Sequence, residues 1–440
     1  MASLSRLSID SENLLDKSIG EGGISQSELE ALSPQLQKLV EQAQNWLKDK
    51  QPRFLNLPLT TDLDAIKHRG QIIAQSFRNT IIFGIGGSSL GGEMLVEILG
   101  DEQPINNVKF YDNVDPSTLI ELEYVDWSVT QLIIISKSGN TAETLSQFLT
   151  VLPTMEHQLG AEHAAQHCLI ITENKDGALY ELAQKLGIEV IEHPPIGGRF
   201  SVLSVVGLLP AYVAGVDIDG VMEGARAMAE RCVEADILQN PAFYNGAAQY
   251  LHAQRNRTIS VVMPYADNLR FVVNWFRQLW AESLGKIDAQ GVNRGLTPTE
   301  AHGVTDQHSQ LQLLLEGPDD KLVTFLSNPG FRFMGRRIPM RFQDIPAIKP
   351  LAGHTIGELF VAELKATRTT LSRRGRPNRT LALLDRDAYA LGELIILLEM
   401  ETVVVAELLG IDPFDQPAVE ESKILTREYL AEISSAMNLI

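Results

Sequence analysis

Two segments in the first half of the chain combine glycine with small hydroxyl side chains, each directly after an apolar run. Residues 84–92 read Gly-Ile-Gly-Gly-Ser-Ser-Leu-Gly-Gly, and residues 136–141 read Ser-Lys-Ser-Gly-Asn-Thr. Such a turn at the start of a helix lets backbone N–H groups approach an anion closely, with help from the helix dipole. Three hydroxyls and one lysine make the second segment a compact acceptor for a terminal phosphate, too small for a triphosphate.

Each segment also has a purely structural interpretation. The glycines at 84–92 suit a tight turn with close packing of strand and helix. Both nucleotide fingerprints fail there, because the third glycine of a dinucleotide loop would fall at Ser89 and no Gly-Lys-Ser/Thr is present. In residues 136–141, Asn140 with Glu143 three residues later is typical of helix capping. Capping leaves Lys137, at the end of an apolar run, unexplained, so we favour phosphate binding.

Three polar residues farther along the chain could supply charge or acid–base chemistry. Arg199 lies between flexible glycines and a helix start, in Gly-Gly-Arg-Phe-Ser at 197–201. Glu282, near the end of an aromatic-bearing helix, could act as a carboxylate base, and His308, in a first helical turn, as an acid–base group or a cap. Isolated arginines and glutamates are mostly solvated surface residues, so these three alone do not decide the function.

The elements that must position these residues follow from the apolar pattern. Short apolar runs alternate with helical segments, which argues for parallel sheets covered by helices on both faces. In such sheets ligands bind beyond the carboxyl ends of the strands. The predicted strands are residues 81–84, 108–111, 132–136, 168–172 and 190–192, then 259–263, 322–326 and 381–384. The clearest helices are 268–284 and 417–437.

The predicted fold class is therefore α/β, with two mainly parallel sheets flanked by helices. We expect a polar helical segment at residues 1–58 and a first α/β domain at 59–215. A helical connector at 216–257 and a second, less clear α/β domain at 258–440 complete the predicted organisation.

Charge and composition restrict the partners. The 440 residues carry 37 Lys and Arg against 56 Asp and Glu, a net charge of −19 that disfavours nucleic acid and anionic membranes. Cys168 and Cys232 offer neither a disulfide framework nor zinc-ligand spacing. The N-terminus lacks a secretory signal, and the apolar segment 391–411 contains four glutamates and is expected to be a buried amphipathic helix. We expect a cytoplasmic protein.

Three other features carry weaker signals. His163 and His167 lie one helical turn apart, but without an evident third metal ligand a solvated helix face is the better interpretation. Asp112 ends a strand where a ribose-binding acid would lie, a coincidence given the failed glycine pattern. A basic cluster without interleaved aromatics favours a loop or subunit contact over nucleic acid; its members are Arg368, Arg373, Arg374, Arg376 and Arg379.

Taken together, six separated segments resemble the glucose-6-phosphate isomerase (phosphoglucose isomerase) family in its shorter bacterial form. They occur in the family's order, at residues 84–92, 136–143, 197–201, 282–286, 303–317 and 414–423. The resemblance implies two sugar-isomerase (SIS) domains, with the active site between them and at a dimer interface. It implies reversible conversion of D-glucose 6-phosphate to D-fructose 6-phosphate, a step of glycolysis and gluconeogenesis, with no metal or cofactor.

By this resemblance, the loop at 136–141 holds the substrate's phosphate and the first glycine-rich loop contacts the sugar. The matching residues are Ser136, Lys137, Ser138, Thr141, Gly87 and Ser88. The chain departs from the longer members of the family here, because Ser138-Gly-Asn replaces Thr-Phe-Thr, which keeps a hydroxyl and shortens the side chains.

The resemblance also implies roles for the groups nearer the reaction. Glu282 matches the catalytic base, Arg199 the arginine beside the reacting carbons, and His308 the ring-opening histidine. Gln416 matches a substrate-contacting glutamine, and Lys423 matches the C-terminal active-site lysine. Because the family's histidine comes from the neighbouring subunit, we expect a homodimer.

Other functions stay open at this point. A non-catalytic sugar-phosphate sensor of the same fold needs the 136–141 loop but has no use for Glu282, His308 and Lys423 together. An isomerase that also acts on mannose 6-phosphate would differ only in pocket shape. A nicotinamide oxidoreductase is disfavoured by the failed glycine spacing. A further departure from the longer members is Pro417-Ala418, in place of Trp-Gly after the glutamine.

Overall fold

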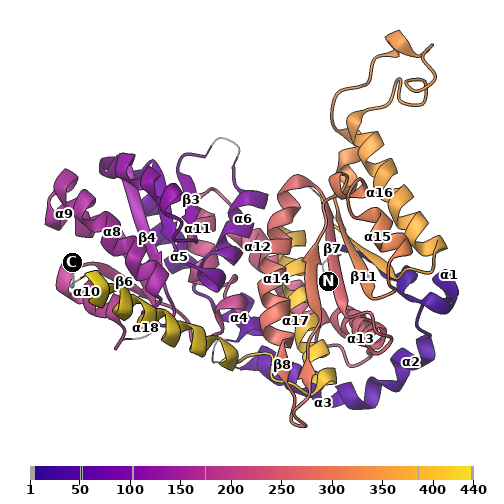
Figure 1. The fold of residues 1–440 in the computed structure, drawn as a ribbon, viewed down its shortest axis with the longest axis horizontal. Coiled ribbons are helices and arrows are strands. Elements are labelled where there is room, and N and C mark those ends of the chain that lie inside the picture. The colour runs from indigo at the N-terminus through magenta and orange to yellow at the C-terminus, as the bar shows by residue number, and fades with distance from the viewer. Residues whose placement is uncertain are drawn as a thin grey trace.

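Two five-stranded sheets lie in two lobes of an elongated molecule, with helices around and between them (Figure 1). The computed structural model describes residues 5–49, 51, 53–101, 104–173, 175–384 and 386–437. The α/β architecture with two mainly parallel sheets flanked by helices is confirmed. The predicted boundaries of the domains stay a prediction.

The first sheet is entirely parallel. Its order is β3 (Asn107–Tyr111), β2 (Asn79–Phe83), β4 (Thr130–Ile135), β5 (Cys168–Thr172) and β6 (Glu189–Glu192). Every residue of β4 and β5 is buried, which explains why both appear in the sequence as unbroken apolar runs. All five predicted strands are present, with ends displaced by at most two residues.

The second sheet is parallel except for one edge strand. Its order is β1 (Ser8–Asp10), β12 (Asn378–Ala382), β11 (Lys321–Ser327), β7 (Ile259–Tyr265) and β10 (Thr297–Glu300), and only β1 is antiparallel to its neighbour. The strand predicted at 381–384 begins at residue 378 instead, because its first residues are polar yet buried. One of them, Arg379, is buried because it pairs with Glu401 of the core at 2.8 Å.

Several short strands escape prediction from the sequence. These are β1, β10 and a hairpin formed by β8 (Lys286–Ile287) and β9 (Asn293–Arg294). Both β1 and β10 are polar edge strands, and β10 contains Pro298, which a sheet tolerates only at its edge. The N-terminal segment, expected to be helical, thus also contributes a strand to the second sheet.

Helices cover both sheets. Those up to residue 213 are α1 (Asp16–Ile19), α2 (Gln26–Ala31), α3 (Ser33–Lys48), α4 (Leu57–Thr60), α5 (Leu63–Ser76), α6 (Leu90–Leu99), α7 (Pro116–Leu119), α8 (Ala142–Leu159), α9 (Ala161–Gln166), α10 (Ala178–Leu186) and α11 (Val205–Val213). The later ones are α12 (Ile218–Arg231), α13 (Pro241–Gln254), α14 (Arg270–Leu284), α15 (Leu311–Glu316), α16 (Ile356–Arg373), α17 (Ala388–Leu409) and α18 (Glu420–Met437). Because α14 packs against α6 of the first lobe and α17 of the second, it lies between the lobes (Figure 1).

Helix α17 is buried as predicted, but it is not amphipathic, because nearly every residue along it is buried. Two of its glutamates have partners: Glu401 pairs with Arg379, and Glu393 accepts backbone N–H groups of the N-terminal segment. Burial raises the pKa of Glu399 well above its ordinary value, because it disfavours the charged form of the carboxyl. Within the described ranges, no helix is both long and apolar enough to cross a membrane.

A stability prediction follows from Glu93, in the first turn of α6. Burial, with the charges of Asp112 and Glu97, raises the pKa of Glu93 to about 7 from an ordinary 4.5. The folded state therefore retains a proton that the unfolded chain has lost, so this group lowers stability progressively as the pH rises from about 4.5 to 7. We expect Glu93→Gln, at a half-buried site, to raise the free energy of unfolding by about 1–2 kcal/mol at pH 8 and much less at pH 4.5.

Urea denaturation at both pH values measures this difference. Glu223→Gln, at an exposed position of α12, is the control, since its charge is not among those that raise the pKa of Glu93. An equal gain for Glu93→Gln at pH 4.5 and pH 8 would contradict the titration argument.

Candidate active site

A cavity of about 990 Å³ lies where the carboxyl ends of the first sheet meet α14 and the C-terminal segment. Segments far apart in the sequence come together here because the strands are parallel and their loops leave at one edge. Of the predicted site residues, those that line it are Gly87, Ser88, Lys137, Ser138, Thr141, Arg199, Glu282, Gln416 and Lys423. Ser136 lies behind this lining, and His308 does not belong to it.

The loop at 136–141 joins β4 to α8 and leads its hydroxyls to the helix N-terminus. Thr141 is the N-cap residue of α8, and its hydroxyl bonds to the Ser136 hydroxyl at 2.9 Å instead of capping the helix. The capping interpretation of Asn140 with Glu143 is wrong, because Asn140 accepts the backbone N–H of Ala178, at the start of α10, at 3.0 Å. The loop is thus held by its contact with α10. The side chain of Thr141 does not cap the N-terminus of α8.

Two residues of this loop differ in accessibility. Ser136 is buried, so its contact to Thr141 supports the loop from below. Lys137 is partly exposed, and its ammonium lies 3.4 Å from the carboxylate of Glu173, another residue of the cavity lining. The cavity lining therefore carries charges of both signs, with Lys137 and Glu173 paired at its edge.

The first glycine-rich loop has the close backbone packing expected from its structural interpretation, and its role in binding stays a prediction. A 3₁₀ turn at Gly86–Ser88 packs on a second one at Gly198–Phe200, and a Cβ at Gly87 would lie 2.1 Å from the carbonyl carbon of Gly198. The hydroxyl of Ser201 also donates to the Gly87 carbonyl at 3.2 Å. Close backbone packing therefore requires glycine at 87, and the same packing brings Arg199 beside the cavity.

Arg199 is fully engaged. Its side chain is 1% exposed, and all five of its N–H groups have acceptors. Nε donates to the Ser283 hydroxyl at 2.8 Å, and Nη1 donates to Glu282 Oε2 at 3.0 Å and Gln416 Oε1 at 2.9 Å. Nη2 donates to two backbone carbonyls, of Pro413 at 2.5 Å and Asp415 at 2.9 Å. Burial lowers the pKa of Arg199, and the charge of Glu282 opposes that shift.

Glu282 lies in the last turn of α14 and is held through both carboxylate oxygens. Oε2 accepts from Arg199, and Oε1 accepts from the amide of Gln278, one helical turn earlier, at 3.1 Å. Gln278 also lines the cavity and was not identified from the sequence. The available signal was its i,i+4 spacing to Glu282, which places both side chains on one helix face. A carboxylate fixed by two donors and facing a cavity can exchange a proton with a fixed substrate.

The C-terminal segment contributes Gln416, Val419 and Lys423 to the lining of the cavity. Gln416 is fixed there through its bond to Arg199, and a short 3₁₀ turn (Pro417–Val419) leads into α18. Lys423, on the first turn of α18, lines the cavity while its ammonium lies 2.6 Å from Glu420.

The structure places His308 differently from the predicted helix start. A 3₁₀ turn (Thr305–Gln307) precedes it, and α15 begins only at Leu311. Its side chain is at least partly accessible to solvent. An accessible histidine away from the cavity of its own chain is available to a second molecule.

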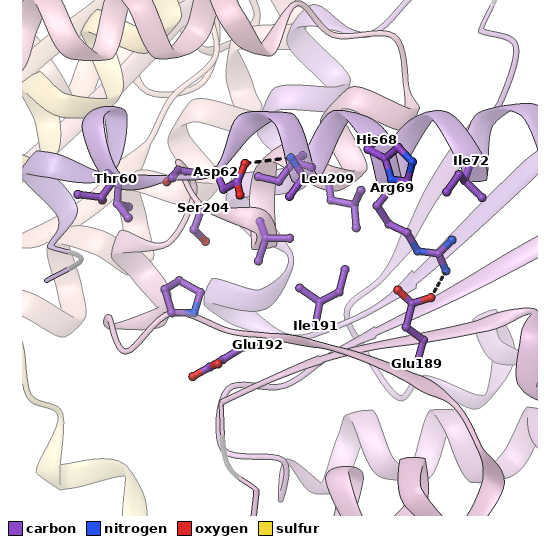
Figure 2. Close-up of a pocket in the computed structure, with 16 residues that line it drawn as sticks. Thr60, Asp62, His68, Arg69, Ile72, Glu189, Ile191, Glu192, Ser204 and Leu209 are labelled. Atoms are coloured by element: carbon purple, nitrogen blue, oxygen red, sulfur yellow. Dashed lines mark hydrogen bonds and ion pairs between the residues drawn. The ribbon is translucent and has the colours of Figure 1, made fainter. Parts of the chain in front are cut away.

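A separate, mostly apolar hollow of about 570 Å³ lies between α5, β6 and the start of α11 (Figure 2). Its polar groups include Arg69, paired with Glu189 at 2.8 Å. It contains none of the predicted site residues.

Comparisons with known proteins point to one family. The family model described as phosphoglucose isomerase matches residues 58–325. A glucose-6-phosphate isomerase of Rubrobacter xylanophilus is 38% identical, over 96% of this chain and 97% of its own. One of Carboxydothermus hydrogenoformans is 39% identical, over 85% of this chain and 83% of its own.

Solved structures show the same fold. The crystal structure of a hypothetical protein from Thermus thermophilus aligns with a TM-score of 0.84 and 32% identity, over 97% of this chain and 100% of the other. A glucose-6-phosphate isomerase from Chlamydia trachomatis aligns with a TM-score of 0.81 at 20% identity, over 98% of this chain and 90% of the other. The fold predicted from the six segments is thereby confirmed, and this chain belongs to the phosphoglucose isomerase (glucose-6-phosphate isomerase) family.

Proposed function

We propose that this chain interconverts D-glucose 6-phosphate and D-fructose 6-phosphate, by ring opening followed by proton transfer through an enediol. The observation that carries the proposal is the carboxylate of Glu282, held between Arg199 and Gln278 in the cavity that also contains the 136–141 loop. The relatives named glucose-6-phosphate isomerase support it over nearly the whole chain.

The phosphate is bound at the hydroxyl-rich loop. The N-terminus of α8 offers backbone N–H groups and a positive dipole end, and Ser138 and Thr141 add hydroxyls. Because the phosphate is remote from the carbons that react, its binding energy serves to hold them in place against Glu282. Gly87 and Ser88 contact the sugar from the neighbouring loop.

Proton transfer between the two carbons needs a single base. Glu282 takes the proton from C2 of the open aldose, the C2 hydroxyl proton passes to the C1 oxygen of the enediolate, and Glu282 then protonates C1, so that one base serves both carbons. The enediolate that forms between these steps carries developing negative charge. The buried guanidinium of Arg199, whose N–H groups are already bonded within the chain, stabilises it through its positive charge.

Ring opening is assigned to His308 of a second subunit, with Lys423 as a cation near the ring. A histidine has the proton affinity to donate to the ring oxygen near neutrality. The arm formed by residues 329–355 supports a homodimer: it projects from the second lobe (Figure 1) and is basic, whereas the chain as a whole carries −19. It also exposes the apolar side chains Phe333, Met334, Met340, Phe342, Ile345 and Leu351.

Complementation tests this shared site. Glu282→Gln and His308→Asn are each expected to be nearly inactive alone. Subunits mixed and allowed to reassociate at random should recover about a quarter of parental activity, because each heterodimer then contains one intact site. Mixtures as inactive as the single variants would show that His308 acts within its own chain, and an active His308→Asn would show that His308 is not needed.

Substrate binding has its own prediction. Thr141→Ala removes a hydroxyl from the phosphate loop, and a hydrogen bond to a charged group is worth about 1.5–3 kcal/mol, so KM should rise about 10- to 100-fold while kcat changes little. Steady-state kinetics measures this split. Thr150→Ala, farther along α8 and exposed, is the control. A loss confined to kcat would contradict the placement of the phosphate.

We infer the wider context from the sequence and the fold. The partner is a small sugar phosphate, with no role for nucleic acid or membrane. The acidic charge and two unpaired, buried cysteines favour the cytoplasm. The reaction itself is assayed by coupled oxidation of glucose 6-phosphate formed from fructose 6-phosphate. Turnover supports the isomerase, and sugar-phosphate binding without turnover would favour the non-catalytic sensor.

A further inference from the structure

The segment at residues 411–416, between α17 and the turn Pro417–Val419, determines where the C-terminal part of the site lies. It contains Gln416 and leads into α18, which contains Lys423. All residues from 420 to 435 are exposed. Packing of α18 therefore gives little support to Lys423, and its place depends on the segment before it.

Two cations hold this segment by its backbone. Arg199 donates to the carbonyls of Pro413 and Asp415. Lys286, in β8, donates to the carbonyls of Asp412, at 3.1 Å, and Asp415 and to the Asp415 carboxylate, at 2.8 Å. The Asp415 carbonyl thus accepts hydrogen bonds from both side chains, from Arg199 of the first lobe and from Lys286 of the second.

The ring of Phe414 provides a third anchor. Its centroid lies 5.4 Å from that of Phe200, 5.9 Å from Trp46 and 6.1 Å from Phe54. These partners come from α3, the turn Phe54–Asn56 and the turn that carries Arg199. The segment is therefore fixed to both the N-terminal helices and the Arg199 turn.

Lys286 does not line the 990 Å³ cavity, but it lies with Glu282 and Gln416 on an adjoining cavity of about 810 Å³. Its ammonium donates to the 412–415 segment, so it acts on the chain at that place. Its side chain is 8% exposed, whereas that of Asp415 is 56% exposed. An ammonium gives up water at such a site only where several acceptors replace it. Two of the three acceptors of the Lys286 ammonium are backbone carbonyls, and the third is the Asp415 carboxylate. The ammonium therefore serves mainly to hold the backbone, and pairing with the Asp415 carboxylate is secondary.

We propose that Lys286 is a positioning residue for the isomerase reaction. By holding the carbonyls of Asp412 and Asp415, Lys286 fixes the segment that carries Gln416. Because this segment also contacts Arg199, Lys286 acts through Arg199 on the orientation of Glu282. The inference rests on the proposed function only for its kinetic consequence. The backbone contacts and their consequence for mobility stand independently of any reaction.

The test compares Lys286→Met, Lys286→Arg and Asp415→Asn by two readouts. Lys286→Met should lower kcat by about 10- to 100-fold with KM within about threefold, because a displacement near 1 Å of catalytic groups costs up to about a hundredfold. Lys286→Arg, which keeps the cation, should regain most of that loss. Asp415→Asn keeps the carbonyl acceptors and should lower kcat by no more than about threefold.

Hydrogen–deuterium exchange of the intact proteins is the second readout. Amides of residues 411–419 should exchange faster in Lys286→Met than in the parent, while those of buried β4 stay unchanged. If Lys286→Met does not fold, Lys286→Gln takes its place, since it removes the charge and shortens the reach. Parental kcat in the variant, or a loss that Lys286→Arg does not reverse, would overturn the positioning role. An inactive parent would overturn the proposed function, and unchanged exchange at 411–419 would overturn the inference alone.

Discussion

Glu282→Gln is expected to reduce kcat by about a thousandfold or more, with KM within about threefold of the parent. The amide has the shape of the carboxylate and can still accept from Arg199 through its oxygen. It cannot take a proton from carbon, because an amide is far too weak a base. Binding is spared because the phosphate loop and the glycine-rich loop belong to other elements of the cavity than α14.

The measurement pairs steady-state kinetics with calorimetric titration of fructose 6-phosphate. Glu300→Gln is the control, since Glu300 also pairs with an arginine, Arg277 of α14, at 3.0 Å, yet does not line the cavity. Turnover within about tenfold of the parent would exclude Glu282 as the base.

Arg199→Lys is expected to lower both activity and stability. An ammonium has three donors in place of five and cannot match the planar fork of the guanidinium. At least two of the present acceptors are then left without a partner in a buried site, at about 1–3 kcal/mol each. We expect the free energy of unfolding to fall by about 3 kcal/mol and kcat by about a hundredfold or more, because Glu282 and Gln416 lose their common donor.

Urea denaturation and kcat of the folded fraction measure the two effects. Arg277→Lys is the matched control, because Arg277 is half-exposed and pairs with one carboxylate, that of Glu300. Loss of stability with parental kcat would reduce Arg199 to a structural role. Loss of kcat with unchanged stability would mean that its five contacts contribute nothing to the fold.

Elements with a simple apolar signature are predictable from this sequence. β4 and β5 are buried on both faces, so they appear as continuous apolar runs and were found almost residue for residue. β12 was misplaced because it begins with buried Asn378 and Arg379, and the partner that permits this, Glu401, lies on the helix that follows. β1 and β10 carry little apolar signal at all, because edge strands need not be apolar.

The residues of the candidate site also divide into those with a signal in the sequence and those without one. Local patterns identified the loops around Gly87 and Thr141 and the isolated Glu282, and the resemblance added Gln416 and Lys423. Their roles stay predictions, although the structure gathers them around one cavity. Gln278 and Lys286 were not singled out, because their contacts depend on packing between helix α14, its hairpin and the chain's C-terminal segment.

The proposed reaction moves a proton between adjacent carbons of a sugar phosphate. The most direct measurement is conversion of fructose 6-phosphate in D₂O with a chelator present, followed by NMR of the product. We expect the parent to form glucose 6-phosphate, with deuterium at C2 in those turnovers in which the Glu282 carboxyl exchanges its proton with solvent before returning it, and Glu282→Gln to form almost none. A folded parent that binds fructose 6-phosphate and forms no glucose 6-phosphate would contradict the proposed reaction.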